Sequence, residues 1–252
     1  MNAKGKVIAT DLDGTLFYPK KRWGMISHKN LKFLRKFIDG GGHVLLISGR
    51  NVNYLEKTKR KIKRDIDYAG CNGAFISVKG QFIKRFYLDN TLALKTLRAI
   101  KKKYPGVAFL VMSEKYNFVF PREGFSFIYA IGYFVYRLNQ GVYRELTIRD
   151  DRLHDYCLEH ERNYKIMIYF GVSKKSKALC YQACETFKKL YPAFDFSYNG
   201  PSIEMTNGKA TKGKAIKQYL DYLKIKHDNV MVVGDSGNDI SMFHQFPNSF
   251  VM

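Results

Sequence analysis

The sequence lacks the features of an exported, disulfide-bonded or membrane-spanning protein. No run approaches the roughly 20 apolar residues that a membrane-spanning helix needs, and the nearest candidate, residues 125–138, is too short. The N-terminal segment passes from a short apolar run directly into acidic residues, which is not the pattern of a signal peptide. We therefore expect a cytoplasmic protein with reduced thiols. The cysteines form no CxxC pair and no zinc-finger spacing; they are Cys71, Cys157, Cys180 and Cys184.

Acidic residues are scarce. The chain has 22 Asp and Glu against 43 Lys and Arg, and its formal net charge is +21. Clustered positive charge binds nucleic acid without sequence preference, but here the basic residues are dispersed, mostly on predicted helix faces such as residues 57–64 and 101–103. We favour solvated helix surfaces as the explanation, so a nucleic-acid partner is not expected. A polyanion-binding patch and an anionic small substrate are the alternatives.

Three short apolar runs predict the strands of a parallel sheet. The chain has 252 residues, which is long enough for one large domain or two modest ones. Each run is β-rich and does not alternate, as is typical of strands buried on both faces. A helical pattern at His28–Asp39, with Ser27 as its N-cap, joins the first two runs in a βαβ unit. A short strand near residues 68–69 and a helix over residues 212–224 complete a doubly wound α/β core. The three runs are residues 7–9, 44–47 and 230–233.

The middle of the chain has a different pattern, which predicts an inserted domain. Two amphipathic helices, residues 91–104 and 174–190, stand among several strand-like runs, as in an α+β module with an antiparallel sheet. We expect residues 83–206 to form this module and residues 1–82 and 207–252 to form the α/β core. The strand-like runs are residues 107–112, 117–120, 125–136, 165–170, 194–198 and 203–205.

Asp11 and Asp13 follow the first predicted strand, two residues apart. In a strand this spacing points both side chains to the same face. Paired carboxylates suit Mg²⁺, and they can divide the work of a nucleophile and an acid–base catalyst. A polar turn built from Asp and Gly explains the same residues, so this motif alone leaves both interpretations open.

A second acidic cluster, Asp235 and Asp239, follows the last predicted strand. A glycine-rich turn that caps a helix is the alternative. Ligands of open α/β sheets bind beyond the carboxyl ends of the strands, so loops far apart in the sequence can meet there. Two acidic loops at one edge repel each other unless a cation compensates them. The pairing therefore favours a metal site.

Ser48 and Lys212 are candidates for holding phosphate. Ser48 opens a Ser-Gly-Arg sequence after the second predicted strand, where a hydroxyl and backbone amides near a helix N-terminus can bind phosphate. An ordinary N-cap is the alternative. Lys212 begins a predicted helix, where a cation opposes the helix dipole unless an anion lies nearby. A solvated surface lysine is the alternative there, and Lys214 is the competing candidate.

These residues resemble the motifs of the haloacid dehalogenase-like phosphatases, and specifically of the Cof-type branch, in which a large α+β cap interrupts the core. The resemblance covers essentially the whole chain, and four motifs in this order are far more specific than any one of them. Asn72-Gly73-Ala74 matches a further segment of this branch. The four motifs are Asp11-Leu12-Asp13-Gly14-Thr15, Ser48-Gly49-Arg50, Lys212 in Thr-Lys-Gly, and Gly234 to Asp239.

The resemblance implies a two-step phosphoryl transfer. Asp11 would attack phosphorus as the nucleophile, Asp13 would protonate the leaving oxygen and then activate water, and Lys212 would offset charge. It also implies a Mg²⁺ ion held by Asp11, the backbone carbonyl of Asp13 and Asp235, with support from Asp239. The phosphate- or substrate-binding positions that it implies are Thr15, Ser48, Gly49, Arg50, Asn72 and Asn238, and Thr15 would also support the geometry of its loop.

The expected activity is hydrolysis of a small phosphomonoester, such as a sugar phosphate or pyridoxal phosphate, by a monomer or homodimer. A sugar phosphomutase shares these motifs, and a non-catalytic nucleic-acid-binding protein would use the basic surface instead. The family usually continues with a strand and a helix after the fourth motif. We therefore expect residues 250–252 to begin that strand, in a chain that is truncated or naturally short. Loose candidates for substrate contacts in the cap are Tyr116, Phe118, Tyr129, Tyr133 and Arg137.

Overall fold

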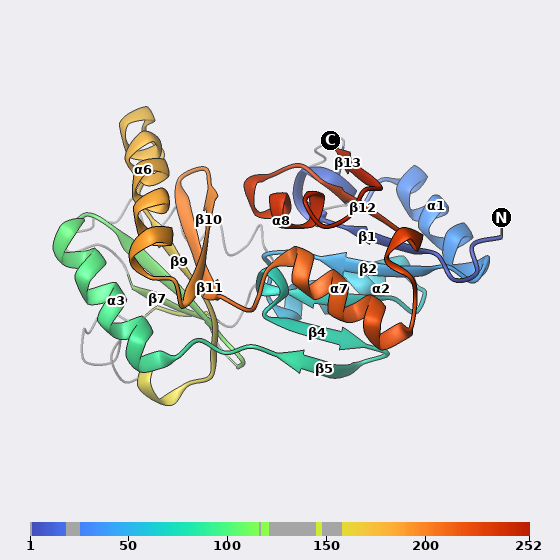
Figure 1. Ribbon diagram of the computed structural model, residues 1–252, viewed down its shortest axis with the longest axis horizontal. Coiled ribbons are helices and arrows are strands. Elements are labelled where there is room, and N and C mark those ends of the chain that lie inside the picture. Colours follow the sequence, from blue (N-terminus) through green and yellow to red (C-terminus); the bar gives the residue numbers. More distant parts are fainter. Residues whose placement is uncertain (1, 19–25, 116, 121–144, 148–157) are drawn as a thin grey trace. The chain divides into compact units, whose positions relative to one another are not determined.

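The computed structural model describes residues 2–252 except 19–25, 116, 121–144 and 148–157. The chain divides into two compact units, residues 1–85 with 210–252 and residues 86–209 (Figure 1). The sequence-based division had placed these boundaries after residues 82 and 206. The strand expected at residues 125–136 lies outside the described residues.

The first unit contains a seven-stranded sheet in the order β13-β12-β1-β2-β3-β4-β5. The pairs from β13 to β3 are parallel, so the prediction of a doubly wound parallel core is confirmed. The last two strands add an antiparallel hairpin that the sequence analysis missed, turning at Lys79 and Gly80 with positive φ at both. The strands are β1 (Val7–Thr10), β2 (His43–Ile47), β3 (Asp67–Gly70), β4 (Phe75–Val78), β5 (Gln81–Arg85), β12 (Val230–Gly234) and β13 (Ser249–Val251).

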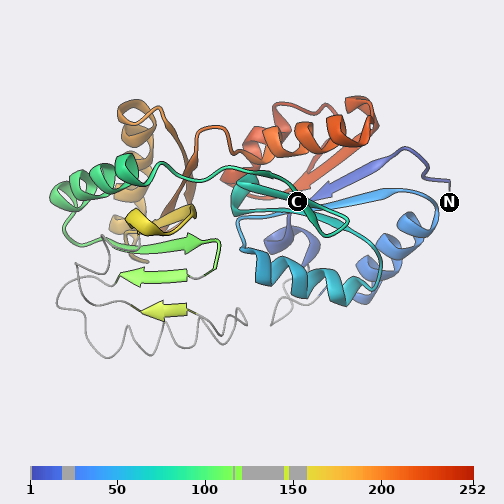
Figure 2. The ribbon, with the colours of Figure 1, turned by 90° about the horizontal axis from the view of Figure 1, so that it is seen from below.

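Helices cover both faces of this sheet. Helices α1 (His28–Asp39) and α2 (Val52–Ile62) lie on one side, and α7 (Lys212–Leu223) lies on the other (Figure 2). The predicted N-cap of α1 is confirmed, because the Ser27 side chain accepts the backbone N–H of Asn30. On the α7 side, Ile216, Tyr219 and Leu220 pack on buried residues of β1, β2 and β12. The short helix α8 (Ile240–Phe243) joins α7 through a hydrogen bond from the Gly213 N–H to the Ser241 hydroxyl at 3.1 Å.

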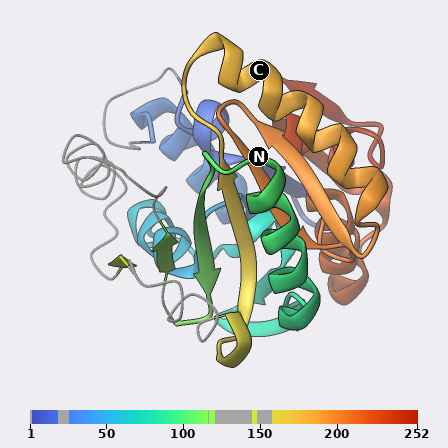
Figure 3. The ribbon, with the colours of Figure 1, turned by 90° about the vertical axis from the view of Figure 1, so that its left-hand side faces the viewer.

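The second unit is an α+β module. Its six-stranded sheet has the order β10-β11-β9-β6-β7-β8, and all its pairs are antiparallel except β7 with β8, which is parallel. Helices α3 (Asn90–Lys103) and α6 (Lys174–Leu190) pack together on one face of the sheet (Figure 3). The strands are β6 (Ala108–Ser113), β7 (Asn117–Phe120), β8 (Glu145–Thr147), β9 (Asn163–Tyr169), β10 (Phe194–Asn199) and β11 (Ser202–Asn207).

Phe118 belongs to the hydrophobic core of this second unit. It is 3% exposed and packs beneath the two helices with Phe109, Val111 and Ile166. The suggestion that Phe118 contacts substrate is therefore wrong, because its position in β7 directs it to the helix-covered face. The other four candidate substrate contacts, Tyr116, Tyr129, Tyr133 and Arg137, lie outside the described residues. Across the described parts of the chain, we find no helix with the length and apolarity to cross a membrane.

Candidate active site

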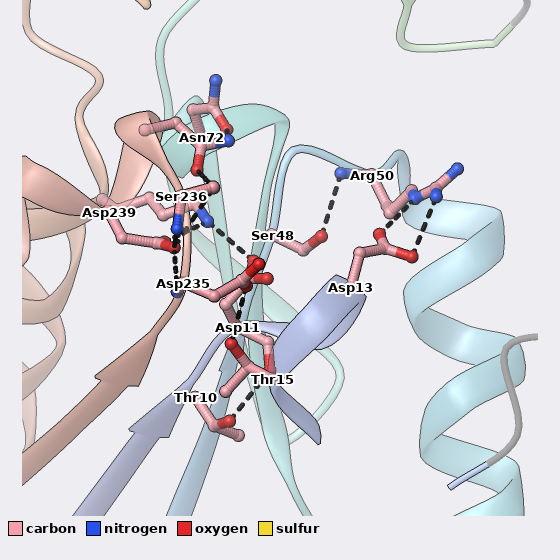
Figure 4. Close-up of polar contacts among 12 residues, drawn as sticks. Thr10, Asp11, Asp13, Thr15, Ser48, Arg50, Asn72, Asp235, Ser236 and Asp239 are labelled. Carbon is pink, nitrogen blue, oxygen red and sulfur yellow. Dashed lines mark hydrogen bonds and ion pairs between the residues drawn. The ribbon is translucent and has the colours of Figure 1, made fainter. Parts of the chain in front are cut away.

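The predicted site residues of the first unit gather at the carboxyl ends of adjacent parallel strands. Asp11 directly follows β1, Ser48 follows β2, and Asp235 follows β12 (Figure 4). Asn72 lies in the short helix η2 (Cys71–Gly73) that begins directly after β3. Since these four strands are neighbours in the sheet, loops far apart in the sequence converge at one edge, as expected for open α/β sheets.

A buried lysine joins two carboxylates at the centre of the site. The Lys212 ammonium donates hydrogen bonds to Asp11 Oδ1 at 2.7 Å and to Asp239 Oδ1 at 2.5 Å. The side chains of Lys212 and Asp239 are fully buried, and that of Asp11 is 6% exposed. Because Lys212 is the first residue of α7, the helix dipole disfavours its charge, and the two anions compensate this effect. Lys214, the competing candidate, is exposed.

Burial and charge set the ionisation of this cluster. Burial raises the pKa of Asp11 from 3.8 to about 6, although the Lys212 ammonium opposes the rise. Burial alone would lower the pKa of Lys212, but the carboxylates of Asp11 and Asp239 outweigh it and hold that pKa above its ordinary value. Burial also raises the pKa of Asp235, against a hydrogen bond from Thr15. At neutral pH the site therefore holds an ionised Asp11 beside a charged lysine.

Asp239 also orders the loop that follows β12. Its Oδ2 accepts the backbone N–H groups of Asp235 and Ser236, both at 2.9 Å. Ser236 and Asp239 form a reciprocal capping box around the short helix η4 (Gly237–Asp239). A Cβ on Gly234 would lie 2.5 Å from the Asp239 carboxyl carbon, so this close approach requires glycine. Both oxygens of Asp239 are thus bound by groups of the protein itself.

Asp13 does not point the same way as Asp11, and the period-two argument for this pair was wrong. Strand β1 ends at Thr10, and Asp13 lies inside the irregular turn η1 (Leu12–Leu16) with φ −78° and ψ 117°. Its carboxylate forms an ion pair with Arg50 at 2.8 Å (Figure 4), whereas that of Asp11 binds Lys212. A turn follows the strand at this point, so strand geometry does not apply to Asp13.

The loop after β1 packs closely against the side chain of Asp235. Thr15 donates its hydroxyl to Asp235 Oδ1 at 2.9 Å and is itself buried. Gly14 has φ +86°, and a Cβ there would lie 2.1 Å from Asp235 Oδ2. The glycine is therefore needed both for the backbone conformation and for room beside the carboxylate. Thr15 contacts this acidic residue in the structure, where the resemblance implied phosphate or substrate.

A left-handed turn links three of the loops. Residues 71–73 have φ values of 48°, 60° and 95°, a conformation that asparagine and glycine tolerate best. The turn brings Asn72 Oδ1 to the side-chain amide of Asn238 at 3.3 Å and its backbone N–H to the carbonyl of Ser48 at 3.0 Å. Ser48 is buried, and its hydroxyl accepts the Arg50 N–H at 3.3 Å.

Ser48 is not the N-cap of the helix that follows it. Asn51 has that role, since its side chain accepts the backbone N–H of Tyr54 at 3.1 Å. Gly49 and Arg50 lie between strand β2 and this cap. The alternative of an ordinary N-cap at Ser48 is therefore wrong.

The acidic cluster fits a hard cation such as Mg²⁺. Asp11, Asp235 and Asp239 each offer a carboxylate oxygen, and these three oxygens lie within 4.8 Å of one another. No described residue makes a hydrogen bond to Oδ2 of Asp11 or of Asp235. Carboxylate oxygens are the ligands that Mg²⁺ prefers, and four carboxylates here, including that of Asp13, face two cations, Lys212 and Arg50.

Two residues that support the site were not singled out from the sequence. Ser236 caps the loop that carries Asp235, and its spacing to Asp239 follows the capping-box pattern, so the signal was present. Tyr54 lies beneath the Arg50 guanidinium, 4.8 Å from carbon Cζ to the ring centroid. No sequence pattern predicts this stacking, because it depends on the angle at which α2 leaves the sheet edge.

Comparison with known proteins identifies the family. A sequence profile of the haloacid dehalogenase-like hydrolases matches residues 8–252. A phosphoglycolate phosphatase of Staphylothermus marinus is 26% identical, over 92% of this chain and 78% of its own length.

Solved structures share the fold. A haloacid dehalogenase-like hydrolase from B. subtilis matches 97% of this chain and 88% of its own, with a TM-score of 0.81 and 18% identity. The sugar phosphatase BT4131, of HAD subclass IIB, matches 97% of this chain and 86% of its own, with a TM-score of 0.74 and 19% identity. The chain belongs to the haloacid dehalogenase-like hydrolases and is an enzyme of that family.

Proposed function

We propose that this enzyme hydrolyses a small phosphomonoester with the help of Mg²⁺, through an aspartyl-phosphate on Asp11. The observation that carries the proposal is the buried ion pair between Asp11 and Lys212 at the carboxyl edge of the sheet. It leaves Asp11 Oδ2 without a hydrogen bond from any described residue, next to a second carboxylate, Asp235. A nucleophilic carboxylate needs such an unengaged oxygen and a fixed orientation.

Asp11 has the ionisation that a nucleophile requires. Its pKa of about 6 leaves it mostly ionised at pH 7. The bond that forms joins Asp11 Oδ2 to phosphorus, and the bond that breaks joins phosphorus to the leaving oxygen. Lys212 stays charged during this step and offsets negative charge on Asp11 and the transferring group.

Asp13 is the candidate for proton transfer. It lies two residues from Asp11, and its carboxylate is on the solvent side of the site, with 48% of the side chain exposed. In the first step its carboxylic acid gives a proton to the leaving alkoxide. In the second step its carboxylate takes a proton from the water that attacks the phosphoaspartate, which restores Asp11 and releases inorganic phosphate.

We assign Asp11 and Asp235 as ligands of Mg²⁺, with Asp239 in a supporting role. The backbone carbonyl of Asp13 is the further ligand that the family resemblance implies. When bound, the cation supplies charge neutralisation to the phosphoryl oxygens. Thr15 holds Asp235 in place for this role through its hydroxyl. We assign phosphate binding to the region of Ser48, Gly49, Asn72 and Asn238, which surrounds Asp11 at the sheet edge.

Small phosphorylated metabolites are the substrates that we propose. The relatives that are named for a substrate act on phosphoglycolate or sugar phosphate, and pyridoxal phosphate belongs to the same size class. We assign the choice among them to the second unit, residues 86–209, as the cap of the resembling family.

A phosphate-release assay tests the proposal. The protein is incubated with a panel of phosphomonoesters, with and without Mg²⁺ and with EDTA. Release should require Mg²⁺, and Asp11→Asn should lower it by about a thousandfold or more while the circular dichroism spectrum shows that the fold is intact. Hydrolysis that persists in Asp11→Asn or in EDTA contradicts the mechanism. Transfer of phosphate to a second sugar without release to water would instead indicate a phosphomutase.

A further inference from the structure

The guanidinium of Arg50 contacts Asp13 through two hydrogen bonds. Nε donates to Asp13 Oδ2 at 2.8 Å, and Nη2 donates to Oδ1 at 3.0 Å, so both carboxylate oxygens are bound (Figure 4). Tyr54, in the first turn of α2, lies beneath the guanidinium at 4.8 Å. The Tyr54 ring packs edge-on against Phe17 with 6.4 Å between centroids. Arg50 therefore stacks on Tyr54, which itself packs against Phe17, while it binds Asp13.

Asp13 needs this support because its backbone position leaves the carboxylate near solvent. The side chain is 48% exposed, and that of Arg50 is 23% exposed. An exposed aspartate samples several rotamers, whereas a forked arginine–carboxylate pair fixes both the position and the plane of the carboxylate. Because so exposed a pair adds little to stability, its main effect is orientation.

The alternative positions of Asp13 would be harmful to the reaction. Asp13 is only two residues from Asp11. A carboxylate that turned toward Asp11 would compete for the Lys212 ammonium, which binds Asp11 and Asp239. Arg50 provides a competing cation, and it binds both oxygens of Asp13.

We propose that Arg50 is a positioning residue, which holds the carboxylate of Asp13 on the leaving-group side of the site and away from the Asp11–Lys212 ion pair. This inference rests on the proposed function, because it matters only if Asp13 transfers protons. It differs from the role that the family resemblance implies for Arg50, which is contact with phosphate or substrate. The fork that would bind two phosphate oxygens binds Asp13 instead.

Steady-state kinetics separate the two roles, since a phosphate ligand contributes to binding and a positioning residue contributes to the chemical step. With the alkyl phosphomonoester that the wild type hydrolyses fastest, Arg50→Ala should lower kcat about tenfold to a hundredfold. KM and the inhibition constant of orthovanadate should stay within about twofold. Arg50→Lys should restore part of the loss, because one ammonium supplies charge but no fork. Lys57→Ala removes an exposed cation from helix α2, which follows Arg50, and should leave kcat unchanged.

A double-mutant cycle with Asp13→Asn completes the test. If Arg50 acts through Asp13, Arg50→Ala should cost nothing further in the Asp13→Asn background. The inference is overturned if Arg50→Ala raises KM and the vanadate constant about tenfold, or if it slows Asp13→Asn as much as it slows the wild type. If the wild type is active and Arg50→Ala leaves kcat unchanged, the positioning role of Arg50 is overturned and the proposed function stands. A wild type that releases phosphate from no ester overturns the proposed function, and this role with it.

Discussion

Replacing Lys212 with alanine should strongly destabilise the protein. The substitution leaves two carboxylates, Asp11 and Asp239, without the cation that now lies 2.7 and 2.5 Å from their oxygens. All three side chains are buried, so solvent cannot replace the ammonium. Removing one partner of such a buried ionic group costs about 3–5 kcal/mol of unfolding free energy.

The pH dependence of this loss follows from Asp11. Burial already raises its pKa to about 6 with Lys212 present, and the pKa must rise further in Lys212→Ala because the ammonium that lowers it is gone. A carboxyl whose folded-state pKa exceeds the unfolded value of 3.8 reduces stability as pH rises through that window. The deficit of the variant relative to the wild type should therefore be larger at pH 8 than at pH 5, where Asp11 is mostly protonated in both.

Urea denaturation followed by circular dichroism measures this deficit at the two pH values. Lys214→Ala, which removes an exposed lysine from the same turn of α7, is the matched control and should stay within about 0.5 kcal/mol of the wild type. Phosphate release by Lys212→Ala should fall about a hundredfold or more, while Lys214→Ala stays active. A Lys212→Ala variant within about 1 kcal/mol of the wild type at pH 8, or one whose deficit is equal at both pH values, refutes the reasoning.

Three further outcomes test other parts of the core. Gly14→Ala places a Cβ 2.1 Å from Asp235 Oδ2, so calorimetry should show Mg²⁺ binding weakened about tenfold or more; unchanged binding would remove Asp235 from the ligand set. Tyr219→Phe deletes the hydroxyl that donates to Asp67 Oδ2 at 2.7 Å, and urea titration should show that the free energy of unfolding falls by about 1.5–3 kcal/mol. A fall of less than about 0.5 kcal/mol would contradict a stabilising role for this hydrogen bond. Because the pKa of Asp11 is about 6, protons should compete with Mg²⁺ below that pH and raise its Kd about tenfold from pH 7 to pH 5; a constant Kd would contradict this.

The parallel core could be predicted from the sequence because its signals are local. Uninterrupted β-rich runs at residues 7–9, 44–47 and 230–233 each lie within the bounds of β1, β2 or β12. The expected burial on both faces holds for β1 and β2, whereas Met231 and Val233 of β12 are only partly buried. Capping residues such as Ser27 and the glycines after Asp39 fix where α1 begins and ends. The hairpin of β4 and β5 was missed because its second strand is largely exposed and has no strong apolar pattern.

The site shows the same division between local and tertiary information. The sequence by itself determined which loops carry carboxylates and where the sheet brings their ends together, because parallel strands place their carboxyl ends at one edge. The tertiary structure decided which groups pair: Asp13 with Arg50 instead of beside Asp11, and Lys212 instead of Lys214 with Asp11 and Asp239. Pairing depends on side-chain direction and burial, which arise when η1, α7 and the loop after β12 pack against one another, and no spacing along the chain encodes them.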